Sequence, residues 1–158
     1  MYPGPQIVVW NVRGLNSRAR RCAIRWLLCT TRASIVCLQE TRMALICSSI
    51  VLDTLGSEFD GSIYLPTDGT RGGILIAWKS RVVTIFDPLF TQNAITVKVC
   101  VPSGAPWWLT TVYGPKATQI SSCSCKSCGT FAPPARAPGC FAAISTSSTA
   151  TRTRTLAP

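Results

Sequence analysis

Along the first part of the chain, short apolar runs typical of strands alternate with segments in which apolar residues recur at helical spacing. Residues 6–12 (QIVVWNV) are a β-branched run of strand length that ends in a turn containing Gly and Asn. Residues 34–39 form a second short apolar run. Between these runs the spacing of three and four predicts an amphipathic helix after Ser17, with an apolar face of Ala19, Cys22, Ala23, Trp26, Leu27 and Thr30. A strand, helix and strand of these lengths predict a right-handed parallel crossover.

The pattern changes after a second expected helix over residues 44–55, which Gly56 would end. The β-rich runs that follow are separated by Pro, Gly and Asp, and they cover residues 62–65, 73–78, 82–86, 94–101 and 107–113. Their close spacing favours hairpins over helical crossovers. The alternation within 94–101 predicts a strand with one buried face, made of Ile95, Val97, Val99 and Val101.

The composition changes sharply near Lys116. All 6 acidic residues and every Trp lie before it, and the residues after it are mostly Ser, Thr, Ala, Pro, Gly and Cys. Such a segment buries too little apolar surface to offset the entropy of ordering it. We therefore expect one truncated domain over 1–116, followed by a disordered, weakly basic tail over 117–158.

Charge and composition narrow the function classes. An apolar fraction of 47% is enough to build a core, and a net charge of +10 favours an anionic partner, of which nucleic acid is the commonest. The chain has no histidine, so a mechanism that needs an imidazole is closed to this chain acting alone. The 9 cysteines follow no secretory leader, and no apolar stretch reaches 18 residues. We therefore expect free thiols, no membrane span and an intracellular location, compatible with the nucleus.

Short polar signatures follow several of the expected strands. They are WNVRGLN at 10–16, CLQET at 37–41, the block DGTRGGILIAW at 68–78, and VYGP at 112–115. In this order and context they resemble the endonuclease/exonuclease/phosphatase superfamily, and more closely the apurinic-type endonuclease domain of plant LINE-type retrotransposons. The resemblance extends from about Ile7 to Pro115, roughly the first half of that domain. It implies an α/β (α+β) fold, the amino-terminal part of a four-layer sandwich with mixed sheets.

The resemblance also implies roles for three residues. Glu40 would hold a divalent metal, usually magnesium, Asn11 would help to organise the metal and its water, and Tyr113 would contact the scissile phosphate. Oxygen ligands of this kind suit magnesium. The simpler interpretations stay open: Glu40 could be solvated or paired with Arg42, Asn11 could be a turn residue, and Tyr113 could be a strand-end aromatic.

Other candidate sites have similarly plain alternatives. The arginines of the first helix could contact a nucleic-acid backbone, although a basic helix face is often only solvated: Arg18, Arg20, Arg21 and Arg25. Trp107 and Trp108 could stack on bases, but adjacent strand residues face opposite sides, so at least one should be core. Four thiols of the tail could bind zinc, although their spacing and surroundings make this a weak signal: Cys123, Cys125, Cys128 and Cys140.

Two motifs that the resemblance implies are missing. The second half of the family's domain carries a Gly-Asp-Phe-Asn motif and a Ser-Asp-His motif, which prepare the attacking water, and neither occurs here. We therefore expect a catalytically incomplete remnant of a retroelement endonuclease, which binds magnesium (a vestigial cofactor) and DNA weakly if at all. The alternatives are a metal-dependent nuclease or phosphatase completed by another chain, and a basic, non-catalytic nucleic-acid-binding polypeptide. An incomplete sandwich would also expose an apolar sheet face, which favours self-association.

A frameshift would account for the missing motifs. Residues 138–146 can be written in permitted codons that, in the neighbouring frame, encode Trp-Leu-Leu-Cys-Gly-Asp-Phe-Asn. The hypothesis is that a shift just after Pro115 converted the second half of the domain into the Ser-, Thr- and Ala-rich segment.

Overall fold

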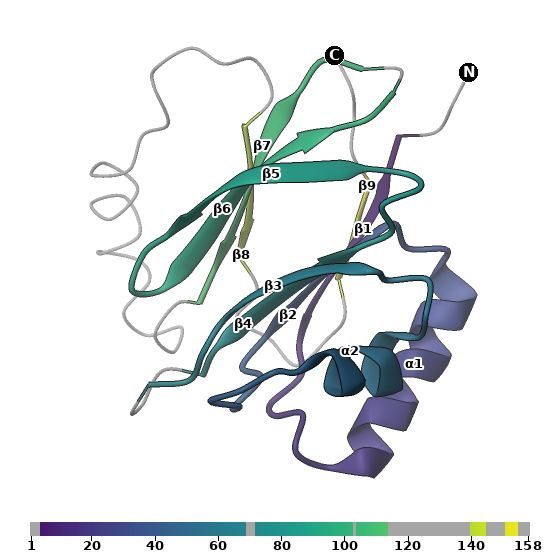
Figure 1. The fold of residues 1–158 in the computed structure, drawn as a ribbon, viewed down its shortest axis with the longest axis vertical. Coiled ribbons are helices and arrows are strands. Elements are labelled where there is room, and N and C mark those ends of the chain that lie inside the picture. Colours follow the sequence, from purple (N-terminus) through teal and green to yellow (C-terminus); the bar gives the residue numbers. More distant parts are fainter. Residues whose placement is uncertain (1–3, 69–71, 103, 114–139, 145–150, 155–158) are drawn as a thin grey trace.

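The computed structural model describes residues 4–68, 72–102, 104–113, 140–144 and 151–154, the last two segments by their backbone alone. Two helices and two sheets make up the described part (Figure 1). Their bounds in chain order are β1 Gln6–Asn11, α1 Arg18–Thr31, β2 Ile35–Gln39, α2 Ser48–Leu55, β3 Gly61–Leu65, β4 Ile74–Trp78, β5 Thr84–Phe90, β6 Ala94–Cys100, β7 Trp107–Val112, β8 Cys140–Ile144 and β9 Thr151–Arg154.

Both sheets are mixed, as expected. The first has the strand order β3-β4-β2-β1-β9, and its central pair β1 and β2 is parallel and joined by α1, which confirms the predicted crossover. The second has the order β5-β6-β7-β8, with antiparallel hairpins from β5 to β7 and a parallel β7–β8 pair. The five β-rich runs are therefore paired mainly as meanders and hairpins.

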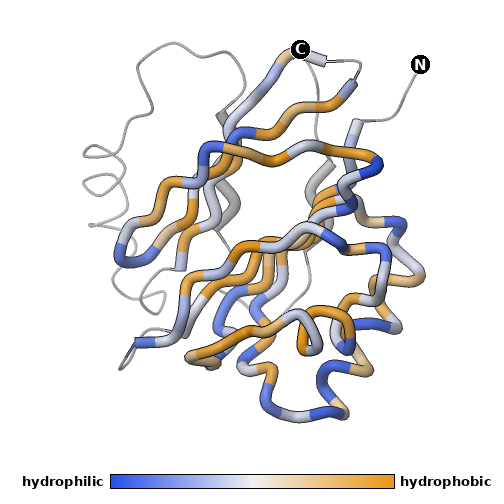
Figure 2. The backbone as a smooth tube through the Cα atoms, viewed as in Figure 1, coloured by the Kyte–Doolittle hydropathy of each residue, from blue (hydrophilic) through white to orange (hydrophobic). Residues whose placement is uncertain are grey.

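The described elements form three layers of the expected four-layer sandwich. The helices cover one face of the first sheet, and the second sheet packs on the other face (Figure 1). Hydrophobic residues are concentrated along the backbone where the layers meet (Figure 2). The predicted buried face of residues 94–101 is confirmed at Ile95, Val97 and Val99, which are fully buried, whereas Val101 lies past the end of β6 and is half-buried. Trp107 also lies in this core, whereas Trp108 is half-buried beneath the Lys98 ammonium.

The predicted apolar face of α1 is wrong. Of the six residues assigned to it, only Leu27 is partly buried, and Trp26 is 71% exposed. The buried positions are Ile24 and Leu28, one turn apart and rotated away from the predicted stripe. The helix carries small or apolar side chains on both faces, and packing onto the sheet selects the branched pair, which fills the core better than Ala and Cys.

Two boundaries also differ from the prediction. Helix α2 begins at Ser48 rather than at residue 44, because the preceding segment is extended and the Met43 carbonyl accepts a hydrogen bond from the Thr67 amide at 3.0 Å. Strand β5 continues to Phe90 past Asp87 and its following proline. A bulge between Phe86 and Leu89 accommodates them, as an edge strand permits.

Most of the segment expected to form a disordered tail lies outside the described residues. Its two described pieces, β8 and β9, pair with β7 and β1 respectively. Cys123, Cys125 and Cys128 also lie outside the described residues, so the weak zinc prediction stays a prediction. The five cysteines whose side chains are described are free thiols: Cys22, Cys29, Cys37, Cys47 and Cys100.

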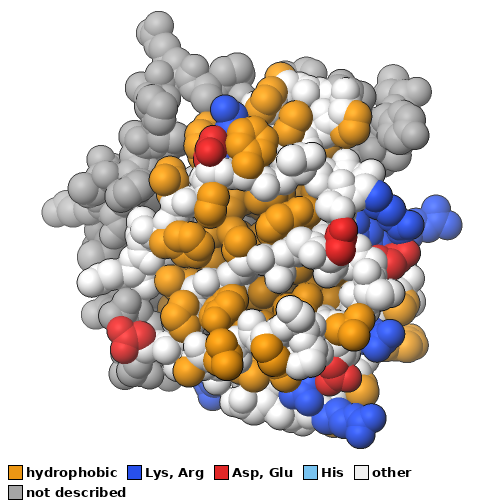
Figure 3. Space-filling model, viewed as in Figure 1, with side chains coloured by type: hydrophobic (Ala, Val, Ile, Leu, Met, Phe, Trp, Pro, Cys, Tyr) orange, Lys and Arg blue, Asp and Glu red, His pale blue; other side chains and the backbone are white. Residues whose placement is uncertain are grey.

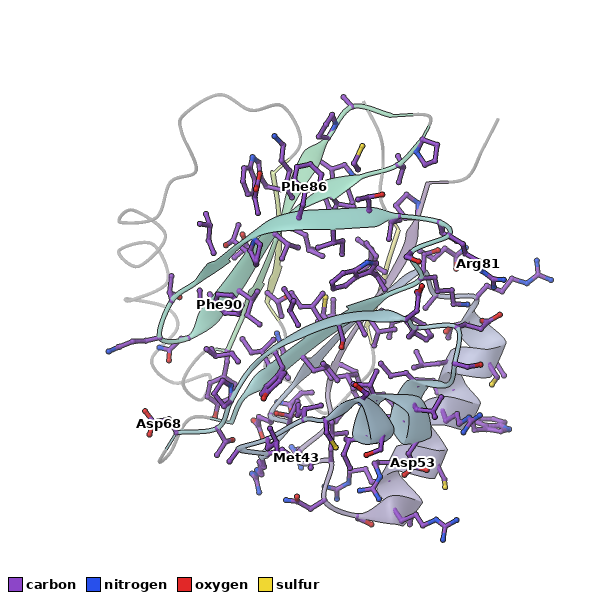
Figure 4. All side chains as sticks on the ribbon, in the orientation of Figure 1. Met43, Asp53, Asp68, Arg81, Phe86 and Phe90 are labelled. Carbon is purple, nitrogen blue, oxygen red and sulfur yellow. The ribbon has the colours of Figure 1, made fainter. Side chains whose placement is uncertain are left out.

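Apolar side chains gather on the face where the edge strands β3 and β5 lie (Figure 3). Leu89 and Phe90 on β5 are 45% and 50% exposed, and Figure 4 shows Phe90 and Phe86 on this strand. Self-association through an exposed sheet remains a prediction that this surface makes reasonable. Neither described helix has the length and apolar character needed to cross a membrane.

Candidate functional site

Parallel pairing brings Asn11 and Glu40 together. Asn11 is the last residue of β1 and lies opposite Gln39, the last residue of β2, so Glu40 follows directly at the same edge of the sheet. The carboxyl ends of adjacent parallel strands are where α/β proteins commonly place functional groups. The predicted site therefore has a physical basis in the sheet itself.

The two side chains are in direct contact. Asn11 Nδ2 donates a hydrogen bond to Glu40 Oε1 at 2.8 Å, and Asn11 Oδ1 accepts one from the Arg13 amide at 3.2 Å. The second carboxylate oxygen of Glu40 accepts a long, largely exposed contact from Arg42 Nη2 at 3.4 Å. Asn11 is 7% exposed, so its amide has a fixed orientation. The structure thus contains both the Asn11–Glu40 pair and the simpler Glu40–Arg42 pair.

A glycine pair closes over Glu40. The Gly72 carbonyl accepts a hydrogen bond from the Arg42 amide at 2.6 Å, and the Gly73 carbonyl accepts one from the Thr41 amide at 3.3 Å. A Cβ at Gly72 would lie 2.9 Å from both Cα and Cγ of Glu40, which is too close for any side chain. The block at 68–78 therefore contributes backbone that shapes the site.

The backbone at the site is unusual. Arg13, Glu40 and Arg42 all have positive φ, between 51° and 56°, a conformation that non-glycine residues adopt rarely and at an energetic cost. The amides of Val12 and Leu15 hold the two loops together by donating to the Gln39 and Thr41 carbonyls at 2.9 and 2.8 Å. This clustering of strained backbone marks the strand ends as the part of the described chain with the features of a functional site.

Tyr113 lies at the same end of the sandwich as the Asn11–Glu40 pair. Among the described residues, no hydrogen bond joins Tyr113 to this pair. Its amide donates to the Asn93 carbonyl at 2.7 Å, and its ring is partly buried against the core between the sheets. The connection to Glu40 is indirect. Gln39 Nε2 donates to the carbonyl of Val112, the residue before Tyr113, at 2.8 Å.

Arginines surround the site from several directions. Arg13 and Arg42 are exposed beside the Asn11–Glu40 pair, and Arg20 donates to the Arg13 and Gly14 carbonyls at 2.5 and 3.4 Å. Arg21 binds the Asp53 carboxylate at 2.6 Å. Of the four helix arginines in the sequence prediction, two are thus used to hold the loop and α2.

The donor set matches a hard cation in kind but is small. A carboxylate and an amide oxygen are ligands that magnesium accepts, with waters and substrate phosphate completing its shell. Both Glu40 oxygens already accept hydrogen bonds, so a cation would compete with the exposed Arg42 contact. Among the residues that the structure describes, no group of three or more His, Cys, Asp or Glu side chains could hold a metal. Glu40 is the carboxylate of the Asn11–Glu40 pair, and it would be the direct ligand of a cation bound there.

Gln39 and Gly72 were not identified by the sequence prediction. The sequence placed Gln39 only within the expected strand 34–39 and the CLQET motif. No local pattern indicates its hydrogen-bond partner, which lies 73 residues away. Gly72 offered a signal, because a Gly-Gly pair before a buried strand indicates close backbone approach.

Comparisons with known proteins support the fold. No protein-family model and no curated protein matches the chain. The human Nocturnin catalytic domain with bound sulfate anion matches 75% of this chain and 52% of its own, with a TM-score of 0.57 and 17% identity. D. rerio TDP2 complexed with single strand DNA product matches 80% of this chain and 52% of its own, with a TM-score of 0.54 and 20% identity. ANGEL2, a 2',3'-cyclic phosphatase, matches 71% and 41%, with a TM-score of 0.50 and 9% identity.

These neighbours are members of the endonuclease/exonuclease/phosphatase superfamily, and the chain spans about half the length of the first two. Sequence identities this low report on fold alone. This chain therefore shares its fold with these structures over about half the length of the first two.

Proposed function

We propose that this chain is a remnant of a magnesium-dependent, phosphodiester-cleaving endonuclease domain from a LINE-type retroelement, and that it lacks part of the catalytic machinery. The observation that carries the proposal is the 2.8 Å hydrogen bond from Asn11 Nδ2 to Glu40 Oε1 at adjacent parallel strand ends. The same fold in a TDP2 structure holds a single strand DNA product, which supports a nucleic-acid phosphate as the ligand.

Each site residue has a role that its geometry allows. Glu40 would hold magnesium, which when bound supplies Lewis-acid polarisation of a phosphoryl oxygen. Asn11 fixes the Glu40 carboxylate through Nδ2, and Arg13 fixes Asn11 in turn. Arg13 and Arg42 are exposed cations beside this pair and would attract a phosphate. The Tyr113 phenol would donate a neutral hydrogen bond to a phosphodiester.

The proposed incompleteness rests on the small number of acidic residues and on the missing imidazole. Of the 6 acidic residues, three are paired with residues outside the Asn11–Glu40 pair: Asp53 with Arg21, Glu58 with Lys79 and Arg81, and Asp60 with Ser80. No imidazole exists in this chain to take a proton from water. General-base catalysis and preorganised charge stabilisation each contribute orders of magnitude, so we expect very little hydrolysis.

A plasmid-nicking assay tests the catalytic part of the proposal. The homogeneous chain is incubated with supercoiled plasmid and magnesium, beside Glu40→Ala and the remote control Glu58→Ala. We expect no nicking that depends on Glu40. Glu40-dependent nicking by the chain alone would overturn the incompleteness and support an active nuclease, and nicking only with an added second half would support completion by another chain.

A thermal-shift titration tests the metal part. Magnesium should raise the unfolding temperature of the parent and of Glu58→Gln, because both retain the Glu40 carboxylate. Glu40→Gln keeps the shape of the side chain and should abolish the shift. An equal shift in all three proteins, or in none, would contradict magnesium binding at Glu40. Salt-sensitive oligonucleotide binding that survives Glu40→Gln without any metal effect would favour the non-catalytic binder.

The frameshift origin has its own test in the nucleotide sequence. The codons for residues 116–158, translated in the neighbouring frame, should encode a Gly-Asp-Phe-Asn motif near residue 143. Codons that are incompatible with that motif would remove the frameshift hypothesis and leave the site geometry unchanged.

A further inference from the structure

We propose that the outward face of α1 binds single-stranded nucleic acid, with phosphates on Arg18 and Arg25 and a base stacked on Trp26. This surface lies outside the Asn11–Glu40 site, and the proposal does not depend on metal binding or cleavage.

The geometry of the helix defines the face. Helix α1 turns Ile24 and Leu28 toward the sheet, which leaves the opposite side in solvent. Arg18 and Arg25 are exposed along one flank of that side, two helical turns and about 10 Å apart along the axis, and the Arg25 guanidinium lies toward the carboxyl end of α2. Trp26 is next to Arg25 and 71% exposed. The remaining exposed side chains of this face are small: Ala19, Cys22, Ala23, Cys29 and Thr30.

A large exposed indole next to exposed arginines of the same helix is chemically specific. Burial of an aromatic side chain is strongly favourable, so a side chain such as Trp26 is expected in the core and not in solvent. The indole instead presents a π-face with cations beside it, the combination by which proteins bind single strands without sequence preference.

The charges on α1 are all of one sign. The helix carries Arg18, Arg20, Arg21 and Arg25 and no acidic residue. Arg21 is neutralised by Asp53 and Arg20 donates to loop carbonyls, but the described residues provide no acidic partner for Arg18 or Arg25. The Arg25 guanidinium lies near Gly56 at the carboxyl end of α2, which steadies its position while leaving it exposed.

The charges on this face favour a nucleic acid over a second copy of the chain or a membrane as its ligand. A second copy docking α1 on α1 would oppose arginine to arginine with no carboxylate to offset them, which is unfavourable. A helix that lies in a membrane interface needs several large apolar side chains on its outer face, and this face has only Trp26. A polyanion with stacking groups satisfies both the arginines and the indole.

Fluorescence anisotropy with a labelled oligothymidylate, in buffer with EDTA, tests the proposal. Arg18→Gln and Arg25→Gln are compared with Arg81→Gln, an exposed arginine at the β4–β5 turn that pairs with Glu58. Trp26→Leu is compared with Leu45→Ala, which also removes an exposed apolar side chain. Circular dichroism verifies that each variant is folded.

We expect Trp26→Leu to weaken binding about tenfold. Each arginine variant of α1 should lower the slope of log affinity against log salt by about 0.7. Arg81→Gln and Leu45→Ala should match the parent. Equal losses at Arg81 and at the α1 arginines would overturn the proposal, because binding would then follow net charge alone. Preferential binding to anionic phospholipid vesicles, or self-association abolished by Trp26→Leu, would also overturn it.

Discussion

Gln39 Nε2 donates a hydrogen bond to the Val112 carbonyl at 2.8 Å, joining residues 73 positions apart on two different sheets. Gln39 is fully buried, and its Oε1 has no hydrogen-bond partner among the described residues. Glu40 directly follows Gln39, and Tyr113 directly follows Val112, each just past the end of its strand. The distance between the strand that carries the proposed metal ligand and the strand that carries the tyrosine is therefore maintained by this buried amide.

Substitutions of Gln39 should separate the contribution of its hydrogen bond to stability from the contribution of its side-chain volume. Gln39→Met keeps the length of the side chain but leaves the Val112 carbonyl without its donor, so the free energy of unfolding should fall by about 1–2 kcal/mol. Gln39→Glu should cost more at neutral pH, because a buried carboxylate faces a carbonyl oxygen. Urea unfolding curves measure both, with the exposed Gln92→Glu as the control.

The Gln39→Glu variant should also recover stability in acid. Burial raises the pKa of the introduced carboxyl above its unfolded value, so the folded state binds the proton more tightly and the protonated acid can donate to Val112. Its deficit relative to the parent should shrink as the pH falls from about 7 toward 5. A deficit that is independent of pH would contradict the buried hydrogen bond.

Gly72→Ala should disturb Glu40 specifically. The new methyl group would lie 2.9 Å from Glu40 Cα and Cγ, so the loop must move, at a cost of about 1–3 kcal/mol. The side-chain amide resonances of Asn11 report the hydrogen bond to Glu40 in a ¹H–¹⁵N spectrum. They should shift strongly in Gly72→Ala and little in Gly104→Ala, whose methyl group would instead meet a Val101 methyl. Unchanged Asn11 resonances in the first variant would contradict the close packing of Gly72 on Glu40.

The contact between Asn11 and Glu40 depends on the local order of elements along the chain. Two apolar runs joined by a helix become parallel neighbours, and the polar residues after them then meet at one edge. The Gln39–Val112 contact depends instead on how two sheets pack, which no local pattern encodes. The face of α1 was misjudged for a similar reason: Trp26 and Ile24 both fit an apolar stripe, and tertiary packing selected Ile24.

Arg21 should matter more to stability than its position on a basic helix implies. Its Nε contacts Asp53 Oδ2 at 2.6 Å, and its Nη1 donates to the Leu15 and Asn16 carbonyls at 2.7 and 3.2 Å; Asp53 lies on α2 beside α1 (Figure 4). The Arg21 side chain is only 15% exposed, so Arg21→Ala should lower the free energy of unfolding by about 1–3 kcal/mol.

Neighbouring variants separate the two contributions of Arg21. Asp53→Asn should cost less, because that side chain is 40% exposed and the carbonyl contacts of Arg21 survive. Arg18→Ala, at an exposed position of the same helix, should cost almost nothing. Equal effects of Arg21→Ala and Arg18→Ala in chemical denaturation would show that the arginine does not hold the loop between β1 and α1.

Cys47 and Cys37 should differ widely in thiol reactivity. Burial raises the pKa of Cys37 to about 12. The pKa of the exposed Cys47 is lowered from 9.0 by the Ser49 hydroxyl, whose Oγ lies 3.0 Å from Sγ, and by the Ile50 amide at the start of α2. Because the thiolate is the nucleophile, iodoacetamide at neutral pH should label Cys47 readily and Cys37 only after unfolding.

The pH dependence of labelling checks the physical cause. The rate at Cys47 should rise with pH and reach half of its maximum below pH 9.0, because its pKa is lowered from that value. Ser49→Ala removes the hydroxyl that lowers the Cys47 pKa most and should move this profile to higher pH, while the exposed Cys22 should keep its own profile in both proteins. Peptide mapping by mass spectrometry assigns each labelled cysteine. A Cys47 profile that does not move in Ser49→Ala would show that the hydroxyl does not stabilise the thiolate.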